Sequence, residues 1–210
     1  MITLDAPTPD TNRSRYFGFT EQYKTIVDAL CTAADQPGVG VTIGITSCAH
    51  HTGVSTVAGQ LAAAAADYTQ RPVLLLDLTG TSSSIAAGME TGQDVGLADA
   101  LDAGDDASQH VRPSGIDHLS FLGHNGSTTE TPVKRRVCAL LQVLRREFAV
   151  IVVDLPPIES GLCLTLAPEL TGVLIVVEAY RTNRHMASRA AQRLSHTNAT
   201  IMGAILNKAS

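Results

Sequence analysis

The chain has 210 residues, a formal net charge of −5 and a sequence pI near 5.7. This length is typical of one domain, and the acidic balance argues against a nucleic-acid-binding surface. The four cysteines include no Cys-x-x-Cys pair, so the sequence indicates neither a disulfide framework nor a zinc site. No apolar run approaches the roughly 20 residues of a membrane span and no signal-peptide pattern is present, so we expect a cytoplasmic protein.

The first third of the chain begins without a clear periodic pattern. Residues 1–18 are rich in Pro, Thr, Asp and Arg and predict an N-terminal arm, followed by one domain over residues 19–210. Apolar residues between Tyr23 and Ala34 recur at helical spacing and predict a helix over residues 20–35. Pro37 and Gly38 end this helix.

A strand, a polar loop and a helix follow. Residues 41–45 form a β-branched run typical of a strand, and the alanine-rich residues 57–66 favour a helix. A Ser/Thr/Gly loop that opens a helix is typical of phosphate binding, because the free N–H groups and the positive end of the helix dipole face the ligand. The consensus G-x-x-x-x-G-K-[ST] falls on residues 48–55. The candidate binding residues are Cys48, Ala49, His50, His51, Thr52, Gly53, Val54, Ser55 and Thr56.

This loop departs from the consensus at one decisive position. Gly53 and Ser55 match, whereas Val54 stands where the lysine is expected, and residues 36–66 contain no Asp, Glu, Lys or Arg. Losing the lysine removes a charge-assisted contact of roughly 1.5–3 kcal/mol. That weakens triphosphate binding by about tenfold to a hundredfold. Backbone N–H groups can still bind an anion, and the alternative is an ordinary turn between strand and helix.

The remaining segments alternate between strands and helices. Two apolar runs, residues 73–78 and 149–155, each reach an acid near the carboxyl end, Asp77 and Asp154. Strands alternating with helices predict an α/β fold with a doubly wound, mostly parallel sheet, although strand order does not follow from spacing. Ligands bind at the carboxyl ends of such strands, so we expect both acids to converge on the loop. Further strands are expected at 119–123, 172–177 and 201–207, and further helices at 97–101, 133–144, 162–170 and 183–196.

Four stretches together resemble a known family. They are residues 46–56, the strand 73–78, Gly96-Leu97-Ala98-Asp99-Ala100-Leu101, and Val150-Ile151-Val152-Val153-Asp154-Leu155-Pro156-Pro157. They resemble the cytoplasmic catalytic domain of bacterial tyrosine kinases of capsule and exopolysaccharide synthesis, which are relatives of the ParA/MinD ATPases. The resemblance runs from about Phe19 to the end of the chain. It implies a single P-loop NTPase-like domain.

The resemblance also implies roles for individual residues. Gly53 and Ser55 fall on the glycine and the magnesium-binding hydroxyl of the Walker A motif, and Asp154 falls on the Walker B acid that holds magnesium through water. Asp77 falls on the first acid of the family's second aspartate motif. The resemblance thus implies Asp77 and Asp154 as remnant catalytic residues, and Ser55, Asp77 and Asp154 as possible Mg²⁺ ligands. Three features depart from the family: Val54 replaces the lysine, Thr79 replaces a second acid, and the C-terminal tyrosine cluster is missing. ATP or ADP with Mg²⁺ is therefore expected to bind weakly or not at all.

Simpler explanations exist for these candidate residues. Asp77 and Asp154 can each cap the turn after a strand without any ligand. The adjacent His50 and His51 can donate to phosphate or bind a metal, but neighbouring side chains point in different directions, and solvated loop surface is the preferred interpretation.

On this basis we expect a degenerate kinase-like protein with weak or no ATP turnover. It would act as a regulatory or binding partner in exopolysaccharide or capsule synthesis or export. The expected partners are a membrane polysaccharide chain-length or export protein, which recruits the chain to the inner face of the membrane, and further copies in a homo-oligomer. One alternative is an active tyrosine autokinase or ATPase that takes a cation from a neighbouring subunit. A second alternative, a ParA/MinD-like positioning ATPase, is disfavoured because the loop lacks that group's extra lysine.

Overall fold

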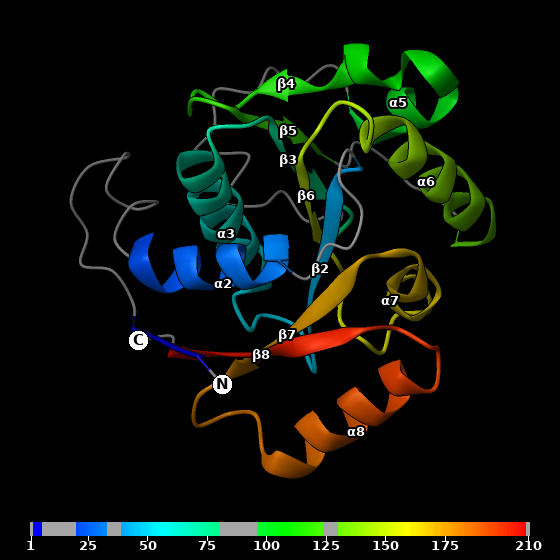
Figure 1. The fold of residues 1–210 in the computed structure, drawn as a ribbon. Helices are drawn as coiled ribbons and strands as arrows, with labels where there is room; N and C mark the ends of the chain where they lie inside the picture. Colours follow the sequence, from blue (N-terminus) through cyan, green and yellow to red (C-terminus); the bar gives the residue numbers. More distant parts are fainter. Residues whose placement is uncertain (1, 6–19, 33–38, 80–95, 124–129, 209–210) are drawn as a thin grey trace.

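The computed structural model describes residues 2–5, 20–32, 39–79, 96–123 and 130–208. Strands and helices alternate along most of this length (Figure 1). The strands are β1 (Ile2–Asp5), β2 (Val41–Ser47), β3 (Val73–Asp77), β4 (Arg112–Pro113), β5 (Leu119–Leu122), β6 (Val150–Asp154), β7 (Gly172–Glu178) and β8 (Ile201–Lys208). The helices are α2 (Thr20–Thr32), α3 (Val54–Thr69), α5 (Leu97–Ala103), η1 (Gly104–His110), α6 (Glu130–Leu144), α7 (Gly161–Leu166), η2 (Ala167–Glu169) and α8 (Arg184–Ser195).

The strands form one sheet in the order β1-β8-β7-β2-β6-β3-β5-β4. All neighbouring pairs are parallel except β4 and β5. Strand β2 therefore lies between β6 and β7 in the interior of the sheet. The predicted α/β fold with a doubly wound, mostly parallel sheet is confirmed.

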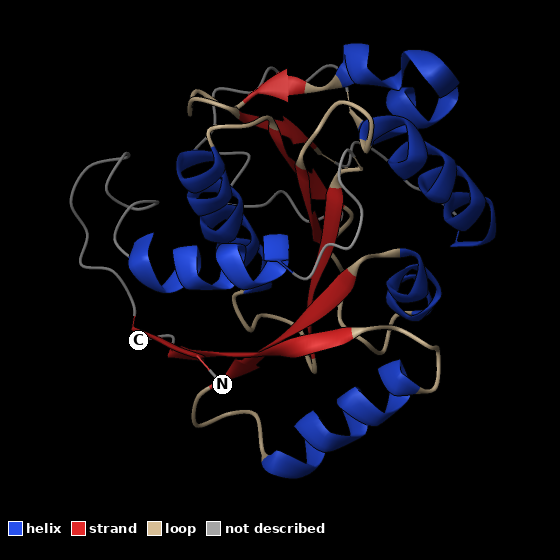
Figure 2. Cartoon of the chain, in the orientation of Figure 1, coloured by secondary structure: helices blue, strands red, loops and turns tan. Residues whose placement is uncertain are grey.

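Helices cover both faces of this sheet (Figures 1 and 2). Helices α2 and α3 lie on one face, and α5, α6, α7 and α8 lie on the other. Side chains of β3 alternate between the two cores, with Val73 and Leu75 in the first and Leu74 and Leu76 in the second. Burial on both faces explains why this strand is an unbroken apolar run in the sequence.

The alanine-rich helix α3 is the main support beneath the loop. Every residue from Val57 to Ala66 is buried, because small side chains let the helix pack closely between the sheet and α2. The Tyr23 hydroxyl of α2 donates to Gln60 Oε1 at 2.8 Å, and burial raises the pKa of Tyr23. This buried contact fixes α2 against α3.

Several elements differ from the sequence expectations. Residues 2–5, expected in the arm, form β1 and pair in parallel with β8 at the edge of the sheet. Helix α2 ends at Thr32, and the predicted continuation to residue 35 lies outside the described residues. The helix expected over 162–170 is the short α7 followed by the 3-10 turn η2, which has Pro168 in its first turn. Proline lacks the N–H that a continuing α-helix needs.

Within the described ranges, no helix is both long enough and apolar enough to cross a membrane. The division into an arm over 1–18 and a domain over 19–210 stays a prediction, since residues 6–19 lie outside the described part of the chain.

Candidate phosphate-binding site

The predicted loop connects β2, which ends at Ser47, to α3, which begins at Val54. Gly53 has φ +80°, a backbone conformation that favours glycine, and a Cβ atom there would displace the Asn207 side chain. Asn207, at the end of β8, donates from Nδ2 to the Thr52 carbonyl at 2.9 Å. His51 also has a positive φ of 60°. The loop is thus a tight turn held by a strand distant in sequence.

Further hydrogen bonds link the loop to the segment after β6. The Thr46 hydroxyl donates to the Pro156 carbonyl at 2.8 Å, and the Ile158 N–H donates to the Ser47 carbonyl at 2.9 Å. Inside the loop, Ser47 Oγ donates to the Ala49 carbonyl at 2.6 Å. Helix α3 has no side-chain N-cap, so its first N–H groups are available to an anion.

The two predicted acids lie side by side at the carboxyl ends of their strands. Asp77 of β3 is in register with Asp154 of β6, and Asp154 is in register with Ile45 of β2. Asp77 Oδ1 accepts hydrogen bonds from the Thr79 N–H at 2.8 Å and the Thr79 hydroxyl at 2.7 Å. Both Asp154 oxygens are buried and have no hydrogen-bond partner within the described residues. The two carboxylates therefore have different environments.

Burial controls the protonation of Asp154. Removal from water raises its pKa to about 7, the Ser55 side chain lowers it in part, and the charge of Asp77 raises it further. Ser55 therefore lies close to Asp154, although its hydroxyl does not reach hydrogen-bond geometry with either oxygen. The structure thus brings Ser55, Asp77 and Asp154 together at one edge of the sheet.

A cleft of about 380 Å³ opens above the loop, within the roughly 300–1,000 Å³ of small-molecule sites. It is lined by Ser47, residues 49–56, Thr79 and residues 155–157. Among these described residues there is no Lys, Arg, Asp or Glu. The side chain of Val54 is half-buried and packs against the core formed with α2 and α3. The cleft therefore offers backbone N–H groups and hydroxyls but no fixed positive charge.

Three predicted candidates lie outside this lining. Asp77 and Asp154 are not among the lining residues, although the adjacent Thr79 and Leu155 are. Cys48 is buried and belongs instead to the core on the side of α7 and α8. It continues the side-chain alternation of β2, which turns it away from the cleft.

Ser55 and Asp154 offer oxygen ligands of the kind that a magnesium ion takes. Mg²⁺ prefers oxygen ligands, keeps several waters, and usually takes one or two carboxylates together with substrate phosphates. A buried carboxylate without a partner, near the Ser55 hydroxyl, fits such an ion. No group of three or more His, Cys, Asp or Glu side chains that could hold a metal occurs in the described part of the chain. His50 and His51 are exposed, with ring centroids 6.3 Å apart.

Comparison with known proteins places this geometry in context. No protein-family model matches the chain. The tyrosine-protein kinase CpsD of Streptococcus pneumoniae is 24% identical over 196 residues, which cover 90% of this chain and 86% of CpsD. The kinase domain of the Escherichia coli tyrosine kinase ETK superposes with a TM-score of 0.77 at 21% identity, covering 91% of this chain and 77% of that one. The MinC:MinD complex of Aquifex aeolicus gives a TM-score of 0.70 at 18% identity, with coverages of 81% and 70%.

The chain therefore has the fold of the ParA/MinD-related P-loop NTPases. Within that class, the resemblance to the bacterial tyrosine kinase domain predicted from the sequence is confirmed, by CpsD in sequence and by ETK in fold.

Sequence reasoning missed the residues that hold the loop in place. Asn207 and Thr46 each bond a carbonyl of another segment. The only signal for Asn207 is a polar residue near the end of an otherwise apolar strand, and its partner lies 155 positions away. Such contacts follow from strand order, which the spacing of residues does not give.

Proposed function

We propose that this chain is a degenerate P-loop domain of the bacterial tyrosine kinase type that binds partners rather than transferring phosphate. The observation that carries the proposal is the absence of lysine and arginine from the described lining of the cleft, with Val54 at the lysine position. Catalysis of phosphoryl transfer depends on positioning and charge neutralisation. A site with N–H groups and no fixed cation favours phosphate binding over efficient transfer.

The surroundings of Asp77 and Asp154 support the same proposal. Thr79 stands where the family's second acid is expected, and its two hydrogen bonds engage Asp77 in the turn after β3. Asp154 and Ser55 are the residues that would hold Mg²⁺, with Asp154 acting through water. A bound Mg²⁺ would supply charge neutralisation at the phosphates, and Asp154 would have to lose its proton for this role. Nucleotide with Mg²⁺ is thus proposed as a weak ligand.

The proposed role is regulatory or scaffolding, in capsule or exopolysaccharide synthesis or export. The support is the resemblance to a bacterial tyrosine kinase over 90% of this chain, together with uninterrupted core strands. The partner we propose is a membrane polysaccharide chain-length or export protein that recruits the chain to the inner face of the membrane.

A turnover assay tests whether the chain is an enzyme. Purified protein with Mg²⁺ and ATP should hydrolyse ATP well below the roughly 1–100 per second of kinases. It should label no tyrosine, because the described lining of the cleft supplies no lysine or arginine to neutralise the terminal phosphate. Asp154→Asn is the control for contaminating ATPases, since only activity of this site should respond to it. Turnover in the kinase range that Asp154→Asn abolishes would overturn the proposal.

An active enzyme completed by a neighbouring subunit is the second candidate. It is favoured by Ser55 and Asp154 remaining in place beside the loop. Arginine-to-alanine scanning in an assembled oligomer separates the two, because only the second candidate predicts an ATPase rate that one arginine substitution removes.

A further inference from the structure

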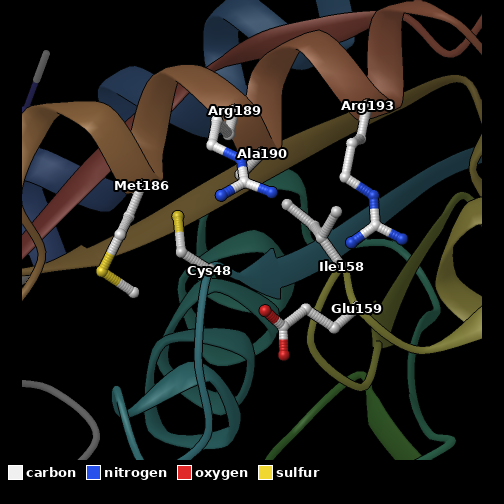
Figure 3. A pocket seen from close by; sticks show the side chains of 7 residues that line it. All are labelled: Cys48, Ile158, Glu159, Met186, Arg189, Ala190 and Arg193. Atoms are coloured by element: carbon white, nitrogen blue, oxygen red, sulfur yellow. The ribbon is translucent and has the colours of Figure 1, made fainter.

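A second, smaller pocket of about 90 Å³ lies between α8, the start of the loop and the segment after β6 (Figure 3). It is lined chiefly by Arg189, Arg193 and Met186 of α8, by Cys48, and by Ile158 and Glu159. None of these residues lines the phosphate cleft. The pocket is therefore separate from the site described above, although the Ile158 N–H donates to the Ser47 carbonyl of the loop at 2.9 Å.

The two arginines point into the same space. They are four residues apart on α8, which places them on one face of the helix one turn apart. Figure 3 shows both guanidinium groups directed from α8 toward Cys48, Ile158 and Glu159. Cys48 and Ile158 are buried and form an apolar floor. The pocket thus presents two planar, charged donor groups above an apolar floor.

No ion pair neutralises these arginines within the described residues. The side chains of Arg189, Arg193 and Glu159 form no ion pair and no hydrogen bond there; the ion pairs in the described part of the chain are Lys24–Asp67, Arg136–Asp102 and Arg181–Glu178. Helix α8 contains three arginines and no acid, in a chain whose net charge is −5. Glu159 is the one acid of the pocket, so the two arginines leave a local excess of positive charge.

The charges of Arg193 and Glu159 shift the pKa values of two nearby cysteine thiols. Burial raises the pKa of Cys163 to about 11, and the Thr46 hydrogen bond and the charge of Arg193 lower it in part. Burial raises the pKa of Cys48, and the charge of Glu159 raises it further. The charge of Glu159 therefore acts on a thiol of the pocket floor, and the charge of Arg193 acts on a buried thiol outside the pocket lining.

We propose that Arg189 and Arg193 form a second anion site, which takes a single oxyanion group of the phosphate class and which Glu159 opposes. Guanidinium groups match the geometry of phosphate oxygens through paired N–H donors. The pocket volume of about 90 Å³ suits one oxyanion group and is too small to enclose a whole nucleotide. The group is either a free anion or a phosphate of a larger ligand, and this site does not depend on the proposed function.

The test is a titration of ¹⁵N-labelled protein with inorganic phosphate at constant ionic strength, followed by NMR. Saturable shifts are expected at the amides of α8 and residues 158–159, apart from any shifts in the loop. Arg189→Gln and Arg193→Gln should each weaken this binding by about tenfold or more. Arg184→Gln, on the same helix but outside the pocket, is the matched control and should leave affinity unchanged.

The Glu159→Gln substitution should raise phosphate affinity, whereas the arginine substitutions lower it. Loss of folding cannot produce such an increase. Removing the opposing charge should tighten phosphate binding by about fivefold. ADP titration of wild type and Arg189→Gln then identifies the source: weaker ADP binding in the variant indicates a phosphate of a larger ligand, and unchanged ADP binding indicates a free anion. The proposal is wrong if phosphate gives no saturable shifts on α8, or if neither arginine substitution nor Glu159→Gln changes its affinity.

Discussion

At the carboxyl end of β6, the Asp154 side chain combines three properties that rarely occur together. It is buried, neither oxygen has a hydrogen-bond partner among the described residues, and its pKa is raised to about 7. An ionised carboxylate without partners destabilises a folded protein. Ionised Asp154 therefore lowers the stability of the folded protein, and such destabilising residues are typical of functional sites.

This residue predicts a specific dependence of stability on pH. The folded pKa lies above the unfolded value of about 4, so the folded state binds the extra proton between about pH 4 and pH 7. The contribution of Asp154 to the free energy of unfolding is thus fully present below pH 4 and is lost as pH rises through 7. Asp154→Asn should remove this loss and raise the free energy of unfolding above pH 7 by about 1–4 kcal/mol.

Urea unfolding at pH 5 and pH 8, with Mg²⁺ chelated, measures this effect. Asp117→Asn is the control, because Asp117 is exposed and its removal should leave the wild-type pH dependence intact. The interpretation of Asp154 fails if Asp154→Asn retains the same loss of stability between the two pH values.

At the scale of elements, β8 positions the loop through one side chain. Asn207 donates to the Thr52 carbonyl and fills the space beside Gly53. Asn207→Ala should lower the free energy of unfolding by about 0.5–1.5 kcal/mol and speed hydrogen exchange of the loop amides. Asn207→Asp keeps the shape but replaces the donor with an acceptor, so it should be at least as disruptive. Unchanged exchange in both variants would show that β8 does not hold the loop.

The sequence predicted the interior strands of the sheet, which are buried on both faces, but it did not predict the edge strands. The interior strands β2, β3, β6 and β7 are apolar runs because each packs against helices on two sides. The edge strands β1 and β4 have four and two residues, too few to show a pattern. The partner of Asn207 depends on strand order, which arises from long-range pairing.

At the scale of the whole molecule, strand order explains how the site is assembled. Because β2 lies between β6 and β7, the loop, Asp154 and the segment after β6 meet at one edge of the sheet. With β3 next to β6, Asp77 joins them. The interior strands thus have the arrangement of a P-loop NTPase fold. The described lining of the cleft, in contrast, contains no lysine or arginine.

The most direct test is calorimetric titration of ADP and ATP with Mg²⁺ into wild type and Val54→Lys. Wild type should bind ATP with a Kd above roughly 1 μM, and Val54→Lys should bind about tenfold to a hundredfold more tightly, because the lysine restores a charge-assisted contact. Val39→Lys adds the same charge at an exposed position outside the cleft and should change nothing. Wild-type binding tighter than roughly 1 μM, about −8 kcal/mol, would contradict the account, as would the absence of ATP binding in both proteins.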